Sequence, residues 1–583
     1  MILVFGGTTE GRKAVETLEE GSMAYYYSTK TGEQAVALHH GIRLDGALDA
    51  EAMQAFCREH AIRLVIDAAH PFASLLHQTV GTVCKRLGLP AIRYERIYPP
   101  RDEDITWIDD YGQIPRDISS LLATTGVQSI ARLKPLEAGG MKVYYRILQR
   151  ESSIALARRQ GATDEQLCFY ADSADIGVDA EAILLKESGL TGGFCEKVEA
   201  ARARGMRVIA LKRPQWPTDG GQWTTVNGPY GLRRAVERLL PEFYPLKSGL
   251  TTGTCATAAA IAAVLQLLKR PVPPEVPVLL PDGETIQVAV DYADGYGCCT
   301  KVAGDDPDVT DGLEIRVRAE MTDGEEGVAI TGGEGVGRFT LPGFDYPPGE
   351  AAINRAPRQM IRQNLSLIAP HRAVRVTISV PRGEEAARHT FNPRLGIEGG
   401  ISIIGVSGIV KPFSEEAFID SIRKCMAVAK ASGAERVVIN SGGKSERFVK
   451  ALYKELPQQA FVEYGNYIGE TLKMAGEMGI AKVTLGVMLG KAVKLAAGHL
   501  DTHSRKATMD KTFVRKMLVE AGCDMDIGGI TLARELWERL PQDRLQPFAK
   551  TIISHCARHC KQLLPGGELT ILLIDDDGNV YSE

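Results

Sequence analysis

The sequence predicts an α/β protein in two parts: a two-lobed parallel-sheet unit over residues 1–242, and a larger unit over residues 247–583. Residues 1–240 alternate short apolar runs with helical patterns, which is typical of a parallel sheet with crossover helices. Residues 241–246, PEFYPL, carry two prolines and no periodicity, and we interpret them as a linker. Beyond it we expect an α+β part to about residue 412 and an α/β part over about 413–583.

The two lobes of the first unit are predicted from two successive sets of strand patterns, divided near residues 125–130. Helical patterns separate the strands of the first set near residues 9–20, 49–60 and 73–87. The expected strands are ILVFG (2–6), MAYYYS (23–28), IRLVIDAA (62–69) and AIRYER (91–96), then SIARL (129–133), VYYRIL (143–148), AILLKES (182–188) and RVIALKRP (207–214).

Bulk composition excludes some classes of protein. The 583 residues carry a formal net charge of −5, which argues against a global nucleic-acid or membrane-surface role. Eleven cysteines, an odd number with no CxxC pair, predict a reducing, cytoplasmic compartment and no metal site. The uncharged stretch 248–268 is long enough to span a membrane, but its Thr and Gly content favours a buried core helix. The N-terminus lacks the charged region of a signal peptide.

A glycine-rich loop follows the first strand and opens a helix: Gly6, Gly7, Thr8, Thr9, Glu10, Gly11 and Arg12. Gly6 and Gly11 take the outer positions of a G-x-G-x-x-G pattern, with Thr8 in the middle position. Such a loop turns backbone N–H groups and a helix N-terminus toward a phosphate. We interpret it as the dinucleotide loop of a Rossmann-like lobe; the alternative is a plain βα turn.

The end of the second strand bears on the choice of cofactor. NAD-binding folds usually place an acid about 20 residues past the loop, to bind the ribose hydroxyls. Here the strand ends in Ser28, Thr29 and Lys30, although Glu33 is near. Hydroxyl groups and a lysine suit a 2′-phosphate, so we expect NADPH rather than NADH.

Two further strand ends carry candidate site residues. His70 follows Asp67 at one of them, as a proton donor or an orienting group, or in a structural Asp–His contact. At the other we expect an anion cradle, the alternative being a flexible loop with solvated lysines; its residues are Lys186, Ser188, Gly189, Gly192, Gly193 and Lys197.

The first part resembles the precorrin-6A reductases of the CbiJ/CobK type. The resemblance rests on GGTTEGR (6–12), RLDG (43–46), IDAAHPFA (66–73), LATTG (122–126), KESGLTGG (186–193) and KRP (212–214), in family order. It implies NADPH-dependent reduction of one double bond of a tetrapyrrole, with Arg213 among the substrate-binding residues. His70, Tyr170 and water all stay open as the proton donor.

The second part shows polar clusters without a known nucleotide loop. Thr251, Thr252 and Thr254 crowd a helix start, where an anion is favoured and N-capping is the alternative. Asp305 and Asp306 lie in an acidic turn, which is as consistent with Asx caps as with a metal. Other candidates are a glycine loop with Gly333, Gly335 and Gly337, the basic Arg394, and His499 and His503 as ligand-orienting groups rather than zinc ligands.

This second part resembles the CbiD family, the cobalt-precorrin-5B methyltransferases. The resemblance rests on SGLTTGTCATAAA (248–260), AGDDPDVTDG (303–312), GGEGVG (332–337), PGEAAINRAPRQMI (348–361), TFNPRLGIEGGISIIGVSGIV (390–410) and GKAVKLAAGHLDTHS (490–504). S-adenosylmethionine as cofactor is implied by the resemblance alone. Val302 stands where the family often has Asp, so a catalytic acid there would have to be Asp305 or Asp306.

Together the two resemblances imply a bifunctional enzyme of corrin-ring biosynthesis. The second part would methylate cobalt-precorrin-5B at carbon 1 to cobalt-precorrin-6A, and the first would reduce this product to cobalt-precorrin-6B. Two rivals stay open: a non-catalytic tetrapyrrole-binding scaffold in one part, or an NADP oxidoreductase for another substrate in the first. We expect small-molecule substrates only, with no nucleic acid or membrane as partner; a homo-oligomer stays open.

Overall fold

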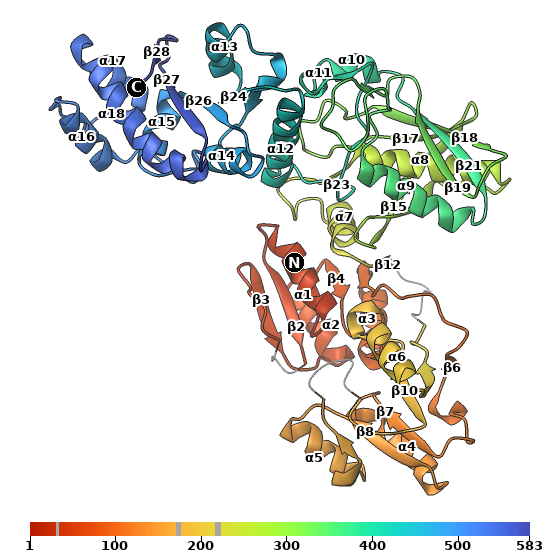
Figure 1. Ribbon diagram of the computed structural model, residues 1–583. Helices are drawn as coiled ribbons and strands as arrows, with labels where there is room; N and C mark the ends of the chain where they lie inside the picture. The colour runs from red at the N-terminus through yellow and green to blue at the C-terminus, as the bar shows by residue number, and fades with distance from the viewer. Residues whose placement is uncertain (31–33, 171–175, 216–222) are drawn as a thin grey trace. The chain divides into compact units, whose positions relative to one another are not determined.

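The computed structural model describes residues 1–30, 34–170, 176–215 and 223–583. Two compact units divide the chain (Figure 1). The first unit comprises Met1–Lys247 and, in addition, Pro277–Gln287. The second unit comprises Ser248–Val276 and Val288–Glu583. The strand patterns VPVLLP (276–281) and TIQVAVDY (285–292) overlap this inserted segment, which the sequence placed in the second part of the chain.

The first sheet is fully parallel, with the strand order β12-β5-β4-β1-β2-β3. Its apolar strands are buried on both faces because helices cover them. The strands are β1 (Ile2–Phe5), β2 (Tyr25–Thr29), β3 (Gly41–Asp45), β4 (Leu64–Asp67), β5 (Ala91–Tyr94) and β12 (Trp223–Val226). Its helices are α1 (Thr9–Glu19), α2 (Ala50–Glu59), α3 (Ser74–Leu87) and α7 (Pro229–Leu239), the first three of which confirm the helical patterns.

The second sheet, also parallel, has the order β6-β11-β10-β7-β8-β9. It contains β6 (Thr106–Ile108), β7 (Ser120–Ala123), β8 (Lys142–Arg146), β9 (Leu167–Cys168), β10 (Ala182–Lys186) and β11 (Arg207–Leu211). Its helices are α4 (Ile130–Ala138), α5 (Glu151–Arg159), α6 (Phe194–Ala203) and the short η1 (Tyr111–Gln113), η2 (Val127–Ser129), η3 (Asp164–Gln166) and η4 (Leu190–Gly192).

The expectation of a strand at residues 129–133 was wrong. This segment begins helix α4, and the strand before it is β7. Ile130, Leu133 and Leu136 are buried at intervals of three residues, which is the spacing of one helix face rather than of a strand. The short stretch 129–133 was too brief to show this period.

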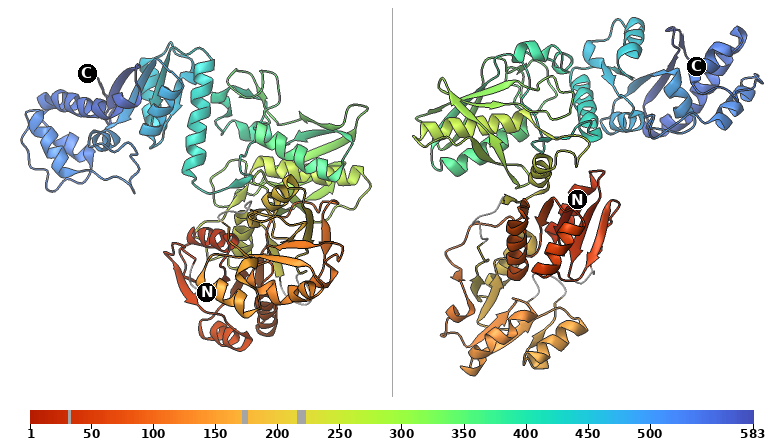
Figure 2. Two further views of the ribbon diagram at one scale, coloured as in Figure 1. Left: turned by 60° about the horizontal axis from the view of Figure 1, so that its bottom comes forward. Right: turned by 180° about the vertical axis from the view of Figure 1, so that it is seen from behind.

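The two sheets of the first unit exchange their edge strands. After β5 the chain leaves the first sheet and adds β6 beside β11 of the second sheet. After β11 it returns and adds β12 beside β5 of the first (Figure 2). The two lobes are therefore joined by two connections, and residues 95–105 form the first of them.

The second unit begins with helix α8 (Thr252–Leu267), which packs with α9 (Arg355–Ile368) on a mixed sheet of order β16-β17-β18-β21-β19. These strands are β16 (Asp291–Ala293), β17 (Tyr296–Thr300), β18 (Glu314–Met321), β19 (Gly327–Gly332) and β21 (Ala373–Ser379). Short strands and helices complete this part: β13 (Gly249–Leu250), β20 (Arg338–Phe339), β22 (Ile397–Glu398), β23 (Ile409–Val410), α10 (Gly383–Ala387) and α11 (Asn392–Leu395). Strands β14 (Glu275–Leu279) and β15 (Thr285–Ala289) pair with each other and lie largely in the inserted segment 277–287 of the first unit.

The rest of the second unit is an α/β layer with the strand order β25-β24-β26-β27-β28, parallel except at β28. The strands are β24 (Arg436–Asn440), β25 (Phe461–Glu463), β26 (Lys482–Met488), β27 (Glu568–Ile574) and β28 (Val580–Tyr581). The helices are α12 (Glu415–Ala431), α13 (Gly443–Leu452), α14 (Ile468–Glu477), α15 (Leu489–Ala496), α16 (Lys511–Glu520), α17 (Ala533–Arg539), α18 (Gln542–Cys560), η5 (Gln458–Ala460) and η6 (Lys561–Leu563).

The predicted fold class is confirmed in both units. The stretch 248–268 forms the buried helix α8, because its alanines and threonines pack against α9 and strands β17 and β18. Among the residues that the structure describes, no helix is both long enough and apolar enough to cross a membrane.

A buried carboxylate of the inserted segment caps helix α7 within the first unit. Glu284 accepts hydrogen bonds from the backbone N–H groups of Tyr230, at 3.0 Å, and of Gly231. The cap residue Gly228 offers no side chain for this purpose. Burial raises the pKa of Glu284 to about 7. The hydrogen bonds from the N–H groups of Gly231 and Tyr230 lower this pKa, but the effect of burial is larger. The folded protein therefore binds a proton here more tightly than the unfolded chain does.

This raised pKa predicts a pH-dependent stability. Because the folded pKa lies above the unfolded value, the free energy of unfolding falls as the pH rises from about 4.5 to 7, by about 1–3 kcal/mol. The Glu284→Gln variant does not lose this stability. We therefore expect the difference in thermal midpoint between the variant and wild type to shift in favour of the variant when the pH is raised from 5 to 8. Scanning calorimetry at both pH values, with Glu275→Gln as the exposed control, measures the difference. A constant offset between wild type and Glu284→Gln at both pH values contradicts the assignment.

Candidate functional site

A large pocket of about 1740 Å³ lies in the first unit, at the carboxyl ends of strands from both sheets. In open α/β sheets ligands bind at these strand ends. The pocket brings together many of the predicted residues, from both lobes: Gly6, Gly7, Thr8, Ser28, Thr29, Lys30, His70, Lys186 and Arg213. Thr9, Glu10, Gly11 and Arg12 continue the loop into α1 but do not line the pocket.

The glycine loop makes a tight turn between β1 and helix α1. Gly7 has φ +89°, a backbone conformation that favours glycine, and a side chain there would point into open space. Thr8 caps helix α1 by accepting the N–H of Gly11 at 3.0 Å and donates to Ala68 O at 2.7 Å. The Gly7 N–H is covered by Gln34, whose Oε1 accepts it at 3.1 Å. Gln34 is a lining residue that sequence reasoning missed.

The end of β2 contributes Ser28 and Thr29, both buried, and the exposed Lys30 to the pocket wall. These groups fit a phosphate on the ribose, since hydroxyls and an ammonium group can bind it. Glu33 lies outside the described residues.

The loop that carries His70 is held by a buried charge cluster. Asp67 is fully buried and accepts hydrogen bonds from His77 Nδ1 at 2.7 Å and from Arg93 Nη1 at 2.9 Å. Arg93 Nη1 also donates to Ala69 O at 3.0 Å, and His77 Nε2 lies 3.0 Å from His70 O. The partner of Asp67 is thus His77 rather than His70, which leaves the His70 ring for the pocket.

His70 is a neutral imidazole. Burial lowers its pKa to about 3, and the positive charges of Arg96 and Lys186 lower it further. The negative charge of Glu10 acts in the opposite direction but does not outweigh them. Its Nδ1 accepts the N–H of Phe72 at 3.2 Å, so the ring proton is assigned to Nε2. His70 therefore offers an N–H donor rather than an acidic imidazolium.

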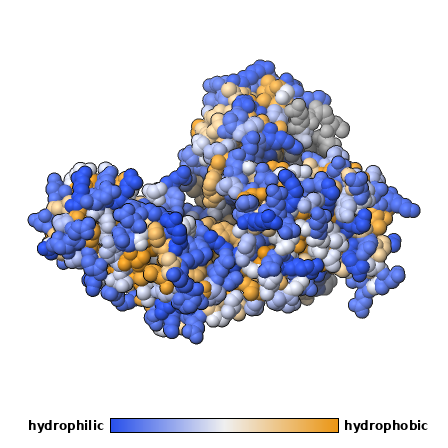
Figure 3. Space-filling view, turned by 90° about the horizontal axis from the view of Figure 1, so that it is seen from above, coloured by the Kyte–Doolittle hydropathy of each residue, from blue (hydrophilic) through white to orange (hydrophobic). Residues whose placement is uncertain are grey.

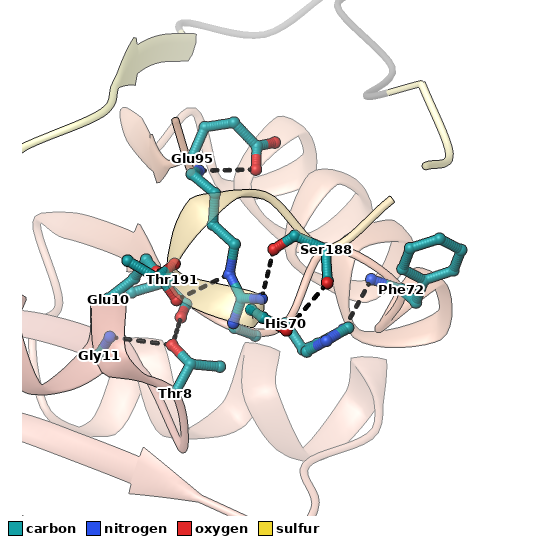
Figure 4. A network of polar contacts seen from close by, with 12 residues as sticks. Thr8, Glu10, Gly11, His70, Phe72, Glu95, Ser188 and Thr191 are labelled. Atoms are coloured by element: carbon teal, nitrogen blue, oxygen red, sulfur yellow. Dashed lines mark hydrogen bonds and ion pairs between the residues drawn. The ribbon is translucent and has the colours of Figure 1, made fainter. Parts of the chain in front are cut away.

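The loop after β10, where an anion cradle is predicted, is bound to other parts of the first unit. Figure 4 shows Thr191 beside Glu10, whose carboxylate accepts the Thr191 hydroxyl. Arg96 Nη1 donates to Ser188 O at 2.8 Å, and Lys197 Nζ donates to Gly192 O at 2.9 Å. The N–H groups of Gly192 and Gly193 are used in the turn itself. These two N–H groups are therefore already bonded within the loop.

A smaller pocket of about 490 Å³ lies beside this loop, at the carboxyl ends of β7, β8 and β10. Its wall includes Arg146, Tyr170, Lys186, Gly192 and Lys197. The Arg146 guanidinium stacks on the Tyr170 ring, 4.1 Å from its centroid. Burial lowers the pKa of both lysines. Within the described part of the chain, neither lysine has a carboxylate within ion-pair distance, whereas Arg213 pairs with Glu187 at 2.6 Å.

In the second unit the predicted hydroxyls are structural. Thr251, Thr252 and Thr254 are buried, and Thr251 caps α8 by accepting the N–H of Thr254 at 3.2 Å. Thr254 donates to Gly408 O at 2.6 Å, and Thr252 accepts the N–H of Ile404 at 2.9 Å. They tie the start of α8 to residues 402–408. Their predicted role in substrate binding stays a prediction.

The acidic turn and the glycine loop are likewise occupied by the chain. Asp306 accepts the N–H of Phe413 at 3.0 Å, and Lys301, almost fully buried, pairs with Asp308 at 3.1 Å. Asp305 has an interaction partner of its own. A side chain at Gly335 would collide with Val380 O, so this glycine, with its neighbours Gly333 and Gly337, packs against the protein's own backbone.

The remaining candidates lie in the α/β part. Arg394 pairs with Glu446 at 2.9 Å and lies 3.8 Å from Glu463. The exposed His499 and half-buried His503 follow helix α15 in a loop, so they do not share a helix face. No group of three or more potential metal ligands occurs among the described residues.

In the comparison with known proteins, a reductase family model matches most of the first unit. The family model described as "Precorrin-6x reductase CbiJ/CobK" matches residues 1–228. A solved structure titled "CobK precorrin-6A reductase" is 18% identical, with 41% of this chain and 96% of that chain covered and a TM-score of 0.34.

The second part matches the models "CbiD" over residues 241–412 and "CbiD, C-terminal domain" over residues 501–583. A cobalt-precorrin-5B C(1)-methyltransferase of Prosthecochloris aestuarii is 41% identical over 345 residues, which are 56% of this chain and 94% of that protein. Its counterpart in Geobacillus kaustophilus is 40% identical over 335 residues, 55% of this chain and 90% of that protein. The crystal structure of the cobalamin biosynthesis protein cbiD from Archaeoglobus fulgidus is 30% identical, covers 46% of this chain and 84% of its own, and has a TM-score of 0.27. The chain therefore belongs to the CbiD family through its second part, and it carries in front of that part a segment of the precorrin-6x reductase CbiJ/CobK family.

Proposed function

We propose that the protein is a bifunctional enzyme of cobalamin biosynthesis. The CbiD part methylates cobalt-precorrin-5B at carbon 1 with S-adenosylmethionine, and the first unit reduces the resulting cobalt-precorrin-6A with NADPH. The observation that carries the proposal is the presence, on one chain, of matches to the families of two consecutive steps. The chain order is then the reverse of the reaction order.

The first unit fits NADPH in the first-lobe side of the large pocket. The turn of Gly6, Gly7 and Thr8, which lines the pocket, would let the pyrophosphate approach the N-terminus of helix α1, and Ser28, Thr29 and Lys30 would hold the 2′-phosphate. When bound, NADPH supplies the hydride. The pocket volume of about 1740 Å³ exceeds the roughly 300–1,000 Å³ of a single ligand site, so it has room for a second ligand beside the cofactor.

The second-lobe side fits the acid side chains of the macrocycle. Lys186 belongs to the walls of both pockets, and Lys197 to the wall of the smaller one. Because neither has a carboxylate partner in the described chain, a substrate carboxylate would relieve two buried positive charges. We assign the smaller pocket to one carboxylate-bearing side chain of the substrate.

His70 would orient the reacting part of the substrate through its Nε2–H group. The proton that completes the reduction must come from another group, since the His70 imidazole is neutral at the pH of the cell. Tyr170, on the wall of the smaller pocket, and a water molecule are the two sources.

Methyl transfer in the second unit requires chiefly that two reactants be held in line, which is worth roughly 7–11 kcal/mol.

The face of the molecule in Figure 3 is mostly hydrophilic, with separate apolar patches. Three large apolar side chains are exposed in or beside the segments 303–312 and 390–410, which carry the resemblance to the CbiD family: Val302 at 53%, Ile404 at 42% and Val406 at 68%. They would contact the flat face of the macrocycle. The loop of Gly333, Gly335 and Gly337 does not fit a cofactor cradle, because the protein's own backbone fills it, and no residue is assigned to the methyl donor.

The proposal is tested by mass spectrometry of the products. The purified protein is incubated anaerobically with cobalt-precorrin-5B and S-adenosylmethionine, with and without NADPH. We expect the gain of one methyl group in both reactions, and of two further hydrogens only with NADPH. Methylation without reduction refutes the role of the first unit, and no methylation refutes that of the second.

Lys197 provides a test of the smaller pocket. Replacing the ammonium group by a methyl group in Lys197→Met removes one charge-assisted contact, so we expect the KM for the tetrapyrrole to rise about 10–100-fold. The Kd for NADPH should stay within about twofold. The exposed lysine in Lys142→Met is the matched control. An unchanged KM for the tetrapyrrole in Lys197→Met removes this pocket from the substrate site.

His70 provides a test by pH dependence. Because its folded pKa is about 3, far below the usual 6.5, His70 stays neutral throughout pH 5–8. We expect reduction rates of wild type and His70→Gln to follow the same pH profile, with His70→Ala slower than His70→Gln by about tenfold since the N–H donor is lost. An acid limb between pH 5 and 8 that disappears in His70→Gln would show that His70 titrates.

A further inference from the structure

Arg96 lies at the point where the chain leaves the first sheet. It follows β5 by two residues, at the start of the connection 95–105 that runs to the second sheet. Its side chain is only 6% exposed, although the connection itself is a surface segment in part. It lines neither of the two pockets. A buried arginine must have hydrogen-bond partners or an ion-pair partner, and Arg96 has them in both lobes.

Its partner in the first lobe is Glu10, in the first turn of α1 directly after the glycine loop. Arg96 Nε donates to Glu10 Oε2 at 3.0 Å, and the Glu10 side chain is only 5% exposed. Burial opposes ionisation of Glu10, but the Thr191 hydroxyl and the charge of Arg96 outweigh it and lower its pKa. Glu10 is therefore an ionised, buried group, bound at the helix that positions the cofactor loop.

The second lobe contributes the loop after β10 to the same cluster. Arg96 Nη1 donates to Ser188 O at 2.8 Å, and the Thr191 hydroxyl donates to Glu10 Oε1 (Figure 4). Leu190 N–H donates to Ile97 O at 2.9 Å. A side chain at Gly192 would lie 2.7 Å from Arg96 Nη1, so the loop can approach the guanidinium only because this residue is glycine. Both carboxylate oxygens of Glu10 are thus bound, one by each side of the lobe boundary.

We propose that the cluster of Glu10, Arg96, Ser188 and Thr191, the lobe clamp, is a positioning device of the reductase: it fixes the cofactor loop of the first lobe against the substrate loop of the second. This rests on the proposed function of the first unit. The loops that it joins carry, within a few residues, the cofactor-binding Thr8 and the two substrate lysines Lys186 and Lys197.

Stability alone is a weak reason for such a cluster. A buried ion pair can often be replaced by apolar side chains without loss of stability, whereas its directed hydrogen bonds select one arrangement of the parts. For hydride transfer, a displacement of about 1 Å between the reactants costs about 100-fold in rate. The lobe clamp therefore sets the distance between cofactor and substrate, rather than the affinity for either.

The test uses the full chain and the variant Thr191→Val, which breaks the hydrogen bond to Glu10 without leaving an unpaired buried charge. Thr191 itself is exposed, so folding should be preserved. We expect hydride transfer in single turnovers to slow about tenfold, with a larger isotope effect from 4-deuterated NADPH. The Kd for NADPH should stay within about twofold. The variants Glu10→Gln and Arg96→Met, alone and combined, should be slower by about 10–100-fold, with the double variant no slower than either single one.

The exposed ion pair of Arg158 and Asp164 in the second lobe supplies the matched control, Arg158→Met. A second readout does not depend on turnover. In wild type, NADPH bound to the first lobe should slow amide hydrogen exchange in residues 188–194, and this protection should be lost in Thr191→Val. Unchanged hydride transfer together with unchanged protection overturns the lobe clamp. A wild type that binds NADPH and gains this protection, but reduces no precorrin, refutes the proposed function and leaves the clamp standing.

Discussion

The site in the first unit depends on one constraint: the carboxyl ends of two parallel sheets must open on the same pocket. Exchange of the edge strands β6 and β12 joins the sheets by two connections instead of one. Residues from the ends of β1, β2, β4, β10 and β11 consequently line a single cavity. Each polar group in that wall is aimed by a strand that is buried on both faces, so little freedom is left to it.

Internal pairing of charges explains how a protein with a net charge of −5 can present a positive pocket. Near the pocket, Arg93 is paired with Asp67, Arg96 with Glu10, and Arg213 with Glu187. These arginines are thereby neutralised, and Arg93 and Arg96 hold loops of the chain without lining either pocket. The lysines Lys186 and Lys197, which lack such partners among the described residues, supply the charge that a ligand would meet. Rigid bidentate donors suit permanent pairs, and flexible ammonium groups suit an exchangeable ligand.

Sequence patterns could predict what lies within one strand–loop–helix unit. The glycine loop, the end of β2 and His70 were found because each follows an apolar strand directly. Arg96, His77 and Arg93 were missed, because their roles depend on which strands become neighbours, and strand order is not written in local periodicity. The basic residue that ends AIRYER was the available signal for Arg96. The segment 277–287 was missed for the same reason, since only the folded chain brings Glu284 to helix α7.

Glu10 shows the same difference between what a local sequence pattern predicts and what the folded chain brings together. Its position in the loop pattern suggested a cofactor contact, because neighbouring residues of such loops make one. In a helix, however, residues one position apart point about 100° away from each other, so a residue at the start of α1 can face the opposite lobe while the loop before it lines the pocket. Glu10 does so, and Arg96 and Thr191 hold it there. A loop pattern therefore identifies the backbone that binds a phosphate, while each side chain within it must be assigned from its own direction.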